Sequence, residues 1–382
     1  MSNTEKPVRA ALVGAGGIAV YKHLPALYAH RDRIEIVGVA EPNAERLGTV
    51  ADEWGIPGRY STTEELLEAE KPDLLVVCTP PVAHRDAVIA GLQAGAWVWC
   101  EKPPMLSLSE YDEVAIYEGH EGPFASYVFQ HRFGSAAQRL RRHLAEKTLG
   151  RPLVSVCHTL WFRTHEYYEV PWRGKWETEG GGPTMGHGIH QMDLLLEILG
   201  DWTEVTARAD VQDRDLETED VSMAMVKFSS GALASVVNSV VSPRETSYLR
   251  FDFQDATVEV EHVYGYDNTS WRWTPAPHLA SESAEPSESW LPEENVPSSH
   301  IQQLDELLDA MEKNSRPRAS GDDGRRVLEF IAALYESAET GRTVRRSDLK
   351  QSGPYYTGMH DPSHTYSLSP DNAATNRKRK NV

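Results

Sequence analysis

The chain has 382 residues, of which 40% are hydrophobic and 25% charged, and its net charge is −19. One core rarely grows beyond roughly 250–300 residues, so we expect two domains. The acidic balance disfavours a nucleic-acid or anionic-membrane partner. The first residues contain no apolar targeting segment, no stretch reaches the roughly 18–20 apolar residues of a membrane span, and the three cysteines lack disulfide or metal-ligand spacing. We therefore expect a cytoplasmic protein.

The first part of the chain alternates short apolar runs with helical periods. Strands are expected at 10–14, 34–40, 74–78 and 96–100, with one helix running through Ala29 and another starting at Asn43. This alternation predicts a parallel sheet that is covered on both faces. We expect a doubly wound α/β Rossmann domain over residues 1–127.

A glycine-rich loop follows the first strand. Residues 14–19, Gly-Ala-Gly-Gly-Ile-Ala, match G-x-G-x-x-A and open a helix. In a dinucleotide site the first glycine permits the turn and the second lets the pyrophosphate approach the backbone. The helix N-terminus offers N–H groups to the phosphates. We expect Gly14, Gly16, Gly17 and Ile18 to bind a dinucleotide, and a merely tight turn is the alternative.

The second strand ends at Glu41, where an acidic side chain of this fold accepts hydrogen bonds from the adenosine ribose. A carboxylate repels a ribose 2′-phosphate, so NAD is favoured over NADP. Arg46 on the next helix could still reach such a phosphate, which keeps NADP open. Glu41 could instead only favour the start of that helix.

Thr79, Glu101 and Lys102 follow the two later strands. Ligands of open α/β sheets bind at the carboxyl ends of the strands, so these residues are expected to line the same crevice as the glycine loop. Pro103 restricts the backbone of Lys102.

From about Val128 the pattern changes. A helix over 135–147 precedes alternating strands at 153–162, 205–209, 221–228, 232–240, 248–253 and 257–262. This pattern predicts an α+β domain with a mostly antiparallel sheet over 128–349. Residues 275–299 are expected to form a long surface loop. Residues 350–382, with the basic run 377–380, are expected to form a flexible tail, with a basic address signal as the alternative.

Together these motifs resemble the Gfo/Idh/MocA family of oxidoreductases, which includes glucose–fructose oxidoreductase and inositol dehydrogenase. Besides the glycine loop and Glu41, the matching motifs are Thr79-Pro80-x-x-x-His84, Glu101-Lys102-Pro103, Trp172-Arg173, Gly180-Gly181-Gly182, Gly188-x-His190-x-x-Asp193 and Gly321-x-Asp323-Gly324-Arg325. They occur in family order to about Leu349.

The resemblance implies a Rossmann domain followed by a large, open, mostly antiparallel sheet. It implies an NAD(P) cofactor and hydride transfer at a secondary alcohol or ketone of a sugar, cyclitol or related polyol. Pro80 and His84 become expected cofactor contacts, together with Gln130 at the domain junction, where Tyr127 and Arg132 are further substrate candidates. A homo-oligomer through the open sheet face is also expected.

Hydride transfer leaves a proton on the alcohol oxygen, so a group with a tunable pKa is required. The resemblance implies that Lys102 and a D-x-x-x-H pair serve catalysis. The histidine is His190, but the aspartate position is Gly186. We expect His190 to exchange the proton with Lys102 sharing the role. His187 is expected either to replace the missing carboxylate or to fill a structural position.

The helix expected over 185–199 carries His187, His190 and Asp193 at intervals of three. At this spacing Asp193 is near enough to orient the His190 ring, or it is only structural. Zinc also uses such side chains, but the three form no closed ligand set, and we expect no metal.

Residues 161–176 are dense in aromatic and hydrogen-bonding side chains. Flat rings cover the apolar faces of sugars, and polar side chains bind the hydroxyls. The expected substrate contacts there are Arg163, His165, Tyr168 and Arg173, which join Lys102, His187 and His190.

Two alternatives to a dehydrogenase or ketosugar reductase remain. One is a glycoside-cleaving enzyme that oxidises a ring carbon transiently with bound NAD. The other is a non-catalytic nucleotide-binding regulator, against which the presence of Lys102 and His190 argues.

Overall fold

The computed structural model describes residues 6–279 and 286–368. The chain divides into two compact units: unit 1 is formed by residues 1–105, 110–128 and 300–325, and unit 2 by 106–109, 129–299 and 326–382. The main crossing follows Val128, next to the expected boundary. Residues 300–325 then return to unit 1. The expected contiguous domains, 1–127 and 128–349, do not include this return. The basic run 377–380 lies outside the described residues.

Unit 1 contains a six-stranded parallel sheet in the order β3-β2-β1-β4-β5-β6. Its strands are β1 (Val8–Val13), β2 (Ile34–Ala40), β3 (Gly58–Tyr60), β4 (Leu74–Val77), β5 (Trp97–Cys100) and β6 (Ala125–Tyr127). The helical segments are η1 (Ala19–His23), α1 (Leu24–Ala29), α2 (Ala44–Trp54), α3 (Thr63–Glu70), η2 (Pro81–Ala83), α4 (His84–Gln93), α5 (Leu108–Ala115) and α9 (His300–Glu312). The predicted Rossmann domain is confirmed.

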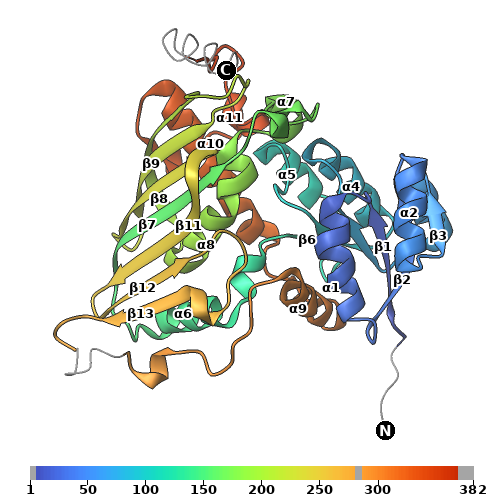
Figure 1. Cartoon of the computed structure of the whole chain (residues 1–382), viewed down its shortest axis with the longest axis horizontal. Coiled ribbons are helices and arrows are strands. Elements are labelled where there is room, and N and C mark those ends of the chain that lie inside the picture. Colours follow the sequence, from blue (N-terminus) through green and yellow to red (C-terminus); the bar gives the residue numbers. More distant parts are fainter. Residues whose placement is uncertain (1–5, 280–285, 369–382) are drawn as a thin grey trace. The chain divides into compact units, whose positions relative to one another are not determined.

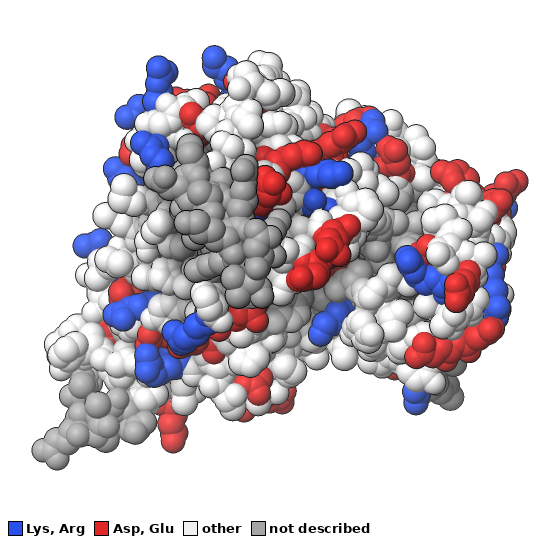
Figure 2. Space-filling view, turned by 45° about the horizontal axis from the view of Figure 1, so that its top comes forward, with Lys and Arg blue, Asp and Glu red and all other residues white. Residues whose placement is uncertain are grey.

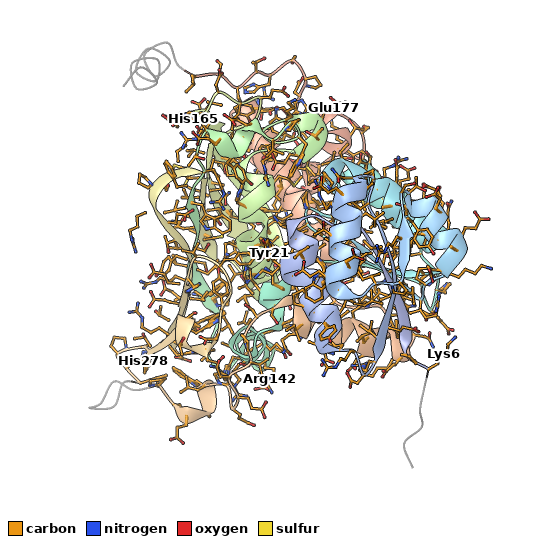
Figure 3. The ribbon with its side chains drawn as sticks, turned by 45° about the vertical axis from the view of Figure 1, so that its right-hand side comes forward. Lys6, Tyr21, Arg142, His165, Glu177 and His278 are labelled. Carbon is orange, nitrogen blue, oxygen red and sulfur yellow. The ribbon has the colours of Figure 1, made fainter. Side chains whose placement is uncertain are left out.

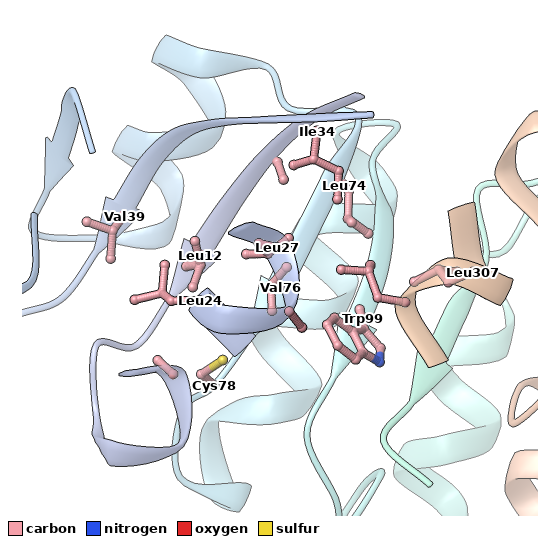
Figure 4. Packing of buried hydrophobic residues seen from close by; sticks show 14 of the residues in the cluster. Leu12, Leu24, Leu27, Ile34, Val39, Leu74, Val76, Cys78, Trp99 and Leu307 are labelled. Atoms are coloured by element: carbon pink, nitrogen blue, oxygen red, sulfur yellow. The ribbon is translucent and has the colours of Figure 1, made fainter. Parts of the chain in front are cut away.

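The core of unit 1 joins the sheet to helices from both ends of the chain (Figure 4). Leu12, Leu24, Val76 and Trp99 pack in one cluster with Leu307 of α9, and all five are fully buried. Because α9 comes about two hundred residues after β5, the returning segment completes a core that the first 128 residues leave open.

Unit 2 contains an eight-stranded sheet in the order β13-β12-β11-β7-β10-β9-β8-β14 (Figure 1). The strands are β7 (Pro152–Phe162), β8 (Trp202–Asp210), β9 (Val221–Phe228), β10 (Leu233–Ser239), β11 (Val241–Phe253), β12 (Ala256–Glu261), β13 (Trp271–Pro275) and β14 (Val344–Arg345). Neighbours are antiparallel except β7 and β10, which pair in parallel. The mostly antiparallel sheet is confirmed, with one parallel pair that the alternating pattern did not predict.

One face of the second sheet packs against helices. The helices of this unit include α6 (Ser135–Glu146), α7 (Trp176–Glu179), α8 (Ile189–Leu199) and the long α10 (Gly321–Thr340), and a π-helical turn, η5 (Thr184–Gly188), leads into α8. The α8 helix contacts β7, β11 and α6, and each of its residues except Glu197 is buried. A helix that is apolar on most sides requires such an environment.

The surface carries both signs of charge. On the face shown in Figure 2, acidic and basic side chains are interspersed, and the basic ones form small groups, so this face presents no continuous basic patch. No helix in the part of the chain that the structure describes combines the length and apolar character of a membrane span.

Candidate functional site

The glycine loop has the geometry of a phosphate cradle. Gly14 has a φ of +90°, and a Cβ there would lie 2.8 Å from the Cys78 carbonyl oxygen, so the turn requires glycine. A Cβ on Gly16 would meet nothing within 4 Å. Gly17 is exposed, and Ile18 packs against the core. The open space beside Gly16, at the start of the η1–α1 helix, fits a pyrophosphate group.

Glu41 braces this loop from the end of β2. Its Oε2 atom accepts a hydrogen bond from the Ala15 N–H (3.0 Å), and its Oε1 atom accepts one from the Asn43 N–H (3.0 Å). The Arg46 guanidinium lies 3.6 Å from the same carboxylate. Both carboxylate oxygens keep a lone pair for a ribose hydroxyl. The residues present therefore fit an adenosine dinucleotide without a 2′-phosphate.

Replacing Glu41 with glutamine is expected to shift cofactor preference. The amide removes the charge that repels a 2′-phosphate, and Arg46 loses its ion-pair partner. We expect the ratio of the NADP+ to the NAD+ dissociation constant to fall about tenfold, roughly 1.4 kcal/mol. Fluorescence titration of both nucleotides measures this ratio. The exposed Glu45→Gln is the control, and an unchanged ratio in Glu41→Gln would contradict the role of the carboxylate.

The ends of β4 and β5 are tied together by His84. This side chain is fully buried, with Nδ1 2.8 Å from the Pro103 carbonyl oxygen and Nε2 3.0 Å from the Thr79 carbonyl oxygen. Burial lowers the pKa of His84. The ring therefore positions the backbone around the Lys102–Pro103 bond, and both of its nitrogens face carbonyl groups and not the crevice. Pro80 is exposed, and the Thr79 hydroxyl has no hydrogen-bond partner among the described residues.

Glu101 is buried beneath the same strand ends. Its Oε2 atom accepts a hydrogen bond from the Lys102 N–H (3.1 Å), while its Oε1 atom faces the rings of His23 and His300. These two imidazoles and one carboxylate lie close enough together to hold a metal ion. Both rings face the same carboxylate oxygen, His23 with Nε2 at 2.8 Å and His300 with Nε2 at 3.2 Å. Lys102 itself is half-buried and lies just after the carboxyl end of β5.

In unit 2 the two candidate histidines lie in different surroundings. The His187 ring contacts Trp161 (5.2 Å between centroids) and Tyr167 (6.1 Å). The His190 ring contacts His131 (5.4 Å) and Tyr264 (5.9 Å). Tyr264 also accepts a hydrogen bond from Gln130, an expected cofactor contact that is buried in this unit.

Asp193 forms an ion pair with Arg132. Arg132 donates from Nε to Asp193 Oδ2 (2.6 Å) and from Nη2 to Asp193 Oδ1, and it also bonds to Glu197. Arg132 and Asp193 are both 1% exposed. A buried guanidinium needs such carboxylate partners, so the structure gives Arg132 this structural contact, and a contact of Arg132 with substrate stays a prediction.

A carboxylate does lie beside Gly186. A Cβ on this glycine would meet only Glu179 Oε1, at 3.6 Å. Glu179 is buried, accepts a hydrogen bond from the Gly174 N–H (2.7 Å) and lies 3.5 Å from Arg173. Glu179 of α7, seven residues earlier in the chain, thus places a carboxylate beside position 186, where the D-x-x-x-H motif has an aspartate. The spacing of that motif could not reveal this neighbour.

Most of the expected substrate contacts gather around Tyr167. The guanidinium of Arg173 lies 3.9 Å and that of Arg163 5.3 Å from the centre of its ring, and the Tyr168 ring packs on it edge-on. His165 is different: its side chain is 47% exposed at the edge of unit 2 (Figure 3). Trp161 and Tyr167, which are part of the aromatic segment, were not chosen from the sequence because nothing local separates a lining ring from a core ring.

Glu219 supports the segment that leads to the histidine helix. Its carboxylate accepts hydrogen bonds from the backbone N–H groups of Gly182 and Thr184 (both 3.1 Å) and from the Tyr335 hydroxyl (2.9 Å). Glu219 is fully buried, and this burial outweighs the three donors and raises its pKa to about 7.

The pKa of Glu219 predicts a loss of stability with rising pH. The folded protein binds the proton of the Glu219 carboxyl group more tightly than the unfolded chain does. The protonated group therefore contributes to folding stability in full below its ordinary pKa near 4.5, and this contribution is lost as the pH rises through about 7. Between pH 5 and 8 we expect the free energy of unfolding of the unchanged protein to fall by about 3 kcal/mol relative to Glu219→Gln. Urea unfolding at each pH measures it. The exposed Glu217→Gln should behave like the unchanged protein, and parallel pH profiles for Glu219→Gln would refute the assignment.

Comparisons with known proteins agree with this geometry. Residues 8–123 match the model of an oxidoreductase family with an NAD-binding Rossmann fold, and residues 137–261 match the GFO/IDH/MocA C-terminal domain. D-glucoside 3-dehydrogenase of Escherichia coli is 25% identical over 89% of this chain and 98% of its own length. D-xylose 1-dehydrogenase (NADP(+)) 2 of Haloferax volcanii is 28% identical over 87% and 98%.

A solved structure extends the likeness to three dimensions. The WlbA dehydrogenase of Bordetella pertussis, in complex with NADH and UDP-GlcNAcA, has a TM-score of 0.77 and is 25% identical to this chain. The match covers 89% of this chain and 99% of that one.

Proposed function

The chain belongs to the GFO/IDH/MocA family of oxidoreductases, with an NAD-binding Rossmann domain, and on this basis we propose that it transfers hydride between NAD and a secondary alcohol or ketone of a sugar, cyclitol or related polyol. The observation that carries the proposal is the set of groups at the ends of β1, β2 and β5: the open space beside Gly16, the carboxylate of Glu41 and the lysine at position 102. The relatives named as D-glucoside and D-xylose dehydrogenases support a sugar as substrate.

Named side chains supply the groups that the proposed reaction needs. When bound, NAD+ supplies the hydride acceptor. Lys102 is proposed to donate a hydrogen bond to the reacting oxygen, and His190 to accept the proton that leaves it. Arg163, Tyr168 and Arg173 are proposed to bind hydroxyl groups, with the rings around Tyr167 against the apolar face of the sugar.

A nucleotide-reduction screen tests this proposal. The purified protein is incubated with NAD+ or NADP+ and a panel of aldoses, inositols, glucosides and uronates, and absorbance at the reduced-nicotinamide band is followed. We expect reduction of NAD+ by at least one sugar or polyol of the panel. Release of the aglycone from a glycoside without net NADH would instead favour the glycoside-cleaving alternative, and nucleotide binding without either reaction would favour a regulator.

We also propose that a second copy of this chain covers the open face of the unit 2 sheet. Paired positions on β7, β10 and β9 place Val154, Leu233, Met223 and Met225 on one side of the sheet. Their exposed fractions are 49%, 56%, 55% and 68%. Apolar side chains at this density on a sheet face are typical of a protein interface.

Substituting both Met223 and Met225 with lysine is expected to produce monomers. A two-fold axis would bring together two new lysines from each copy. Their four charges would repel each other across a face that is apolar in the unchanged protein. Light scattering coupled to size-exclusion chromatography measures the mass. Glu217→Lys, away from this face, is the control. A monomeric unchanged protein at micromolar concentration would contradict the proposed interface.

The proposed compartment is the cytoplasm. Cys78, Cys100 and Cys157 are free and buried, which suits a reducing environment.

A further inference from the structure

Three segments of unit 1 meet at Glu101. Its Oε1 atom lies 2.8 Å from Nε2 of His23 and 3.2 Å from Nε2 of His300. His23 ends η1, the turn directly after the glycine loop, and His300 begins α9. Glu101 follows β5 and is 5% exposed, while the two histidines are 0% and 4% exposed. The Trp99 ring packs against both imidazoles, with centroids 4.5 and 5.9 Å away.

The hydrogen bonds determine the protonation of this cluster. His23 Nδ1 is buried and has no hydrogen-bond partner among the described residues. Because an ionised carboxylate only accepts hydrogen bonds, His23 donates to it from Nε2. Burial lowers the pKa of His300, which donates from Nε2 to the same oxygen.

Glu101 is the carboxylate that these hydrogen bonds keep ionised. Although burial opposes ionisation, the hydrogen bonds from His23 and His300 hold the pKa of Glu101 well below its ordinary value. The thiols of Cys78 and Cys100 interact with this carboxylate but stay uncharged, because burial raises their pKa values. The nearby cationic side chains on the adjoining segments are those of Lys22 and Lys102, and the ring of His84 also lies near the carboxylate.

The second carboxylate oxygen connects this charge to Lys102. Glu101 Oε2 accepts the Lys102 N–H at 3.1 Å, and His84 holds the carbonyl of Pro103 on the other side. The backbone around Lys102 is thus fixed on one side by the side chain of the preceding residue and on the other by His84 of α4, which contacts the Pro103 carbonyl. Glu101 and Lys102 both act electrostatically on His84, so the two charges lie in the same region, and a carboxylate there favours the charged form of the lysine.

We propose that His23 and His300 are positioning residues that hold Glu101 as an ionised carboxylate against the Lys102 backbone, which fixes Lys102 and keeps its side chain cationic. Lys102 then acts as a hydrogen-bond donor to the substrate oxygen, a part of the inference that rests on the proposed function. The cluster also links the turn after the glycine loop and the start of α9 to that lysine.

The test measures the titration of Lys102 directly and needs no substrate. Lysines of the full chain are reductively methylated with ¹³C-formaldehyde, and the Lys102 signal is assigned by its loss in Lys102→Arg. Its pKa is then followed by NMR in Glu101→Gln, His300→Leu and His300→Gln. Glu113→Gln, which breaks a surface pair with Arg85, and replacement of the exposed His120 with asparagine are matched controls in unit 1. Thermal melting identifies any variant that does not fold.

We expect the pKa of Lys102 to fall by about one pH unit in Glu101→Gln, since a nearby opposite charge shifts a pKa by about 1–3 units. His300→Leu should shift it in the same direction, because Glu101 loses a donor and becomes easier to protonate. His300→Gln, which restores an N–H donor, should recover most of the shift, and the controls should show none.

An unchanged Lys102 pKa in folded Glu101→Gln and His300→Leu would overturn the proposal. The proposal would also be overturned if the purified protein contained stoichiometric zinc that is lost in His300→Leu. The side chains of His23, Glu101 and His300 would then be metal ligands. A failure to reduce NAD+ with any sugar would refute the proposed function while leaving this titration as a valid test of the cluster.

Discussion

Replacing Lys102 with methionine is expected to lower kcat by about 10²- to 10⁴-fold while NAD+ binding stays close to that of the unchanged protein. Methionine keeps the length and apolar stem of the side chain but removes every N–H donor. The backbone contacts of residue 102 with Glu101 remain, so the strand end keeps its geometry. The loss should therefore appear in kcat and only weakly in the dissociation constant of NAD+.

Single-turnover kinetics and nucleotide titration separate these two effects. Lys313→Met removes an exposed lysine of unit 1, 3.6 Å from Asp309, and is the matched control because such surface pairs contribute little. Equal losses in kcat and NAD+ affinity for Lys102→Met would indicate a cofactor ligand and not a group that acts on the substrate.

Replacing His190 with glutamine is expected to reduce kcat by about 10²-fold or more and to remove one inflection from the pH profile of kcat/KM. Glutamine preserves a hydrogen-bonding side chain of similar size among the rings of His131 and Tyr264, but it cannot exchange a proton near neutral pH. A purely structural histidine would leave the shape of that profile unchanged.

His187→Gln provides the sharpest comparison for His190. The His187 ring contacts Trp161 and Tyr167, so its replacement should raise KM for the sugar more than it lowers kcat. The exposed His278→Gln is the control for a histidine change as such. If the pH inflection were lost in His187→Gln and kept in His190→Gln, the proposed roles would be reversed.

The Rossmann half was predictable because its local signals agree with one another. Apolar runs, the glycine loop and Glu41 each belong to a few consecutive residues, and β2 spans the expected residues 34–40. The expected strands at 74–78 and 96–100 differ from β4 and β5 by a single residue each. Short strands such as β3 and β6 were missed, since three residues carry no recognisable period.

The partners of the candidate site residues were harder to predict. Glu101 was expected at the crevice, but its contacts with His23 and His300 join residues separated by 78 and 199 positions. Likewise Asp193 was placed beside His190 by helical spacing, whereas a buried arginine 61 residues away takes its carboxylate. Such contacts depend on tertiary packing, which overrides the spacing within one helix.

Deuterium transfer tests the central claim, hydride transfer between a sugar carbon and NAD, most directly. A substrate found in the screen is deuterated at its secondary carbinol carbons one at a time, and the reduced nucleotide is examined by mass spectrometry and NMR. The account predicts that one labelled position gives NADH with deuterium at C4 of the nicotinamide ring. NADH that forms without label from any carbinol position, or with label from solvent, would contradict it.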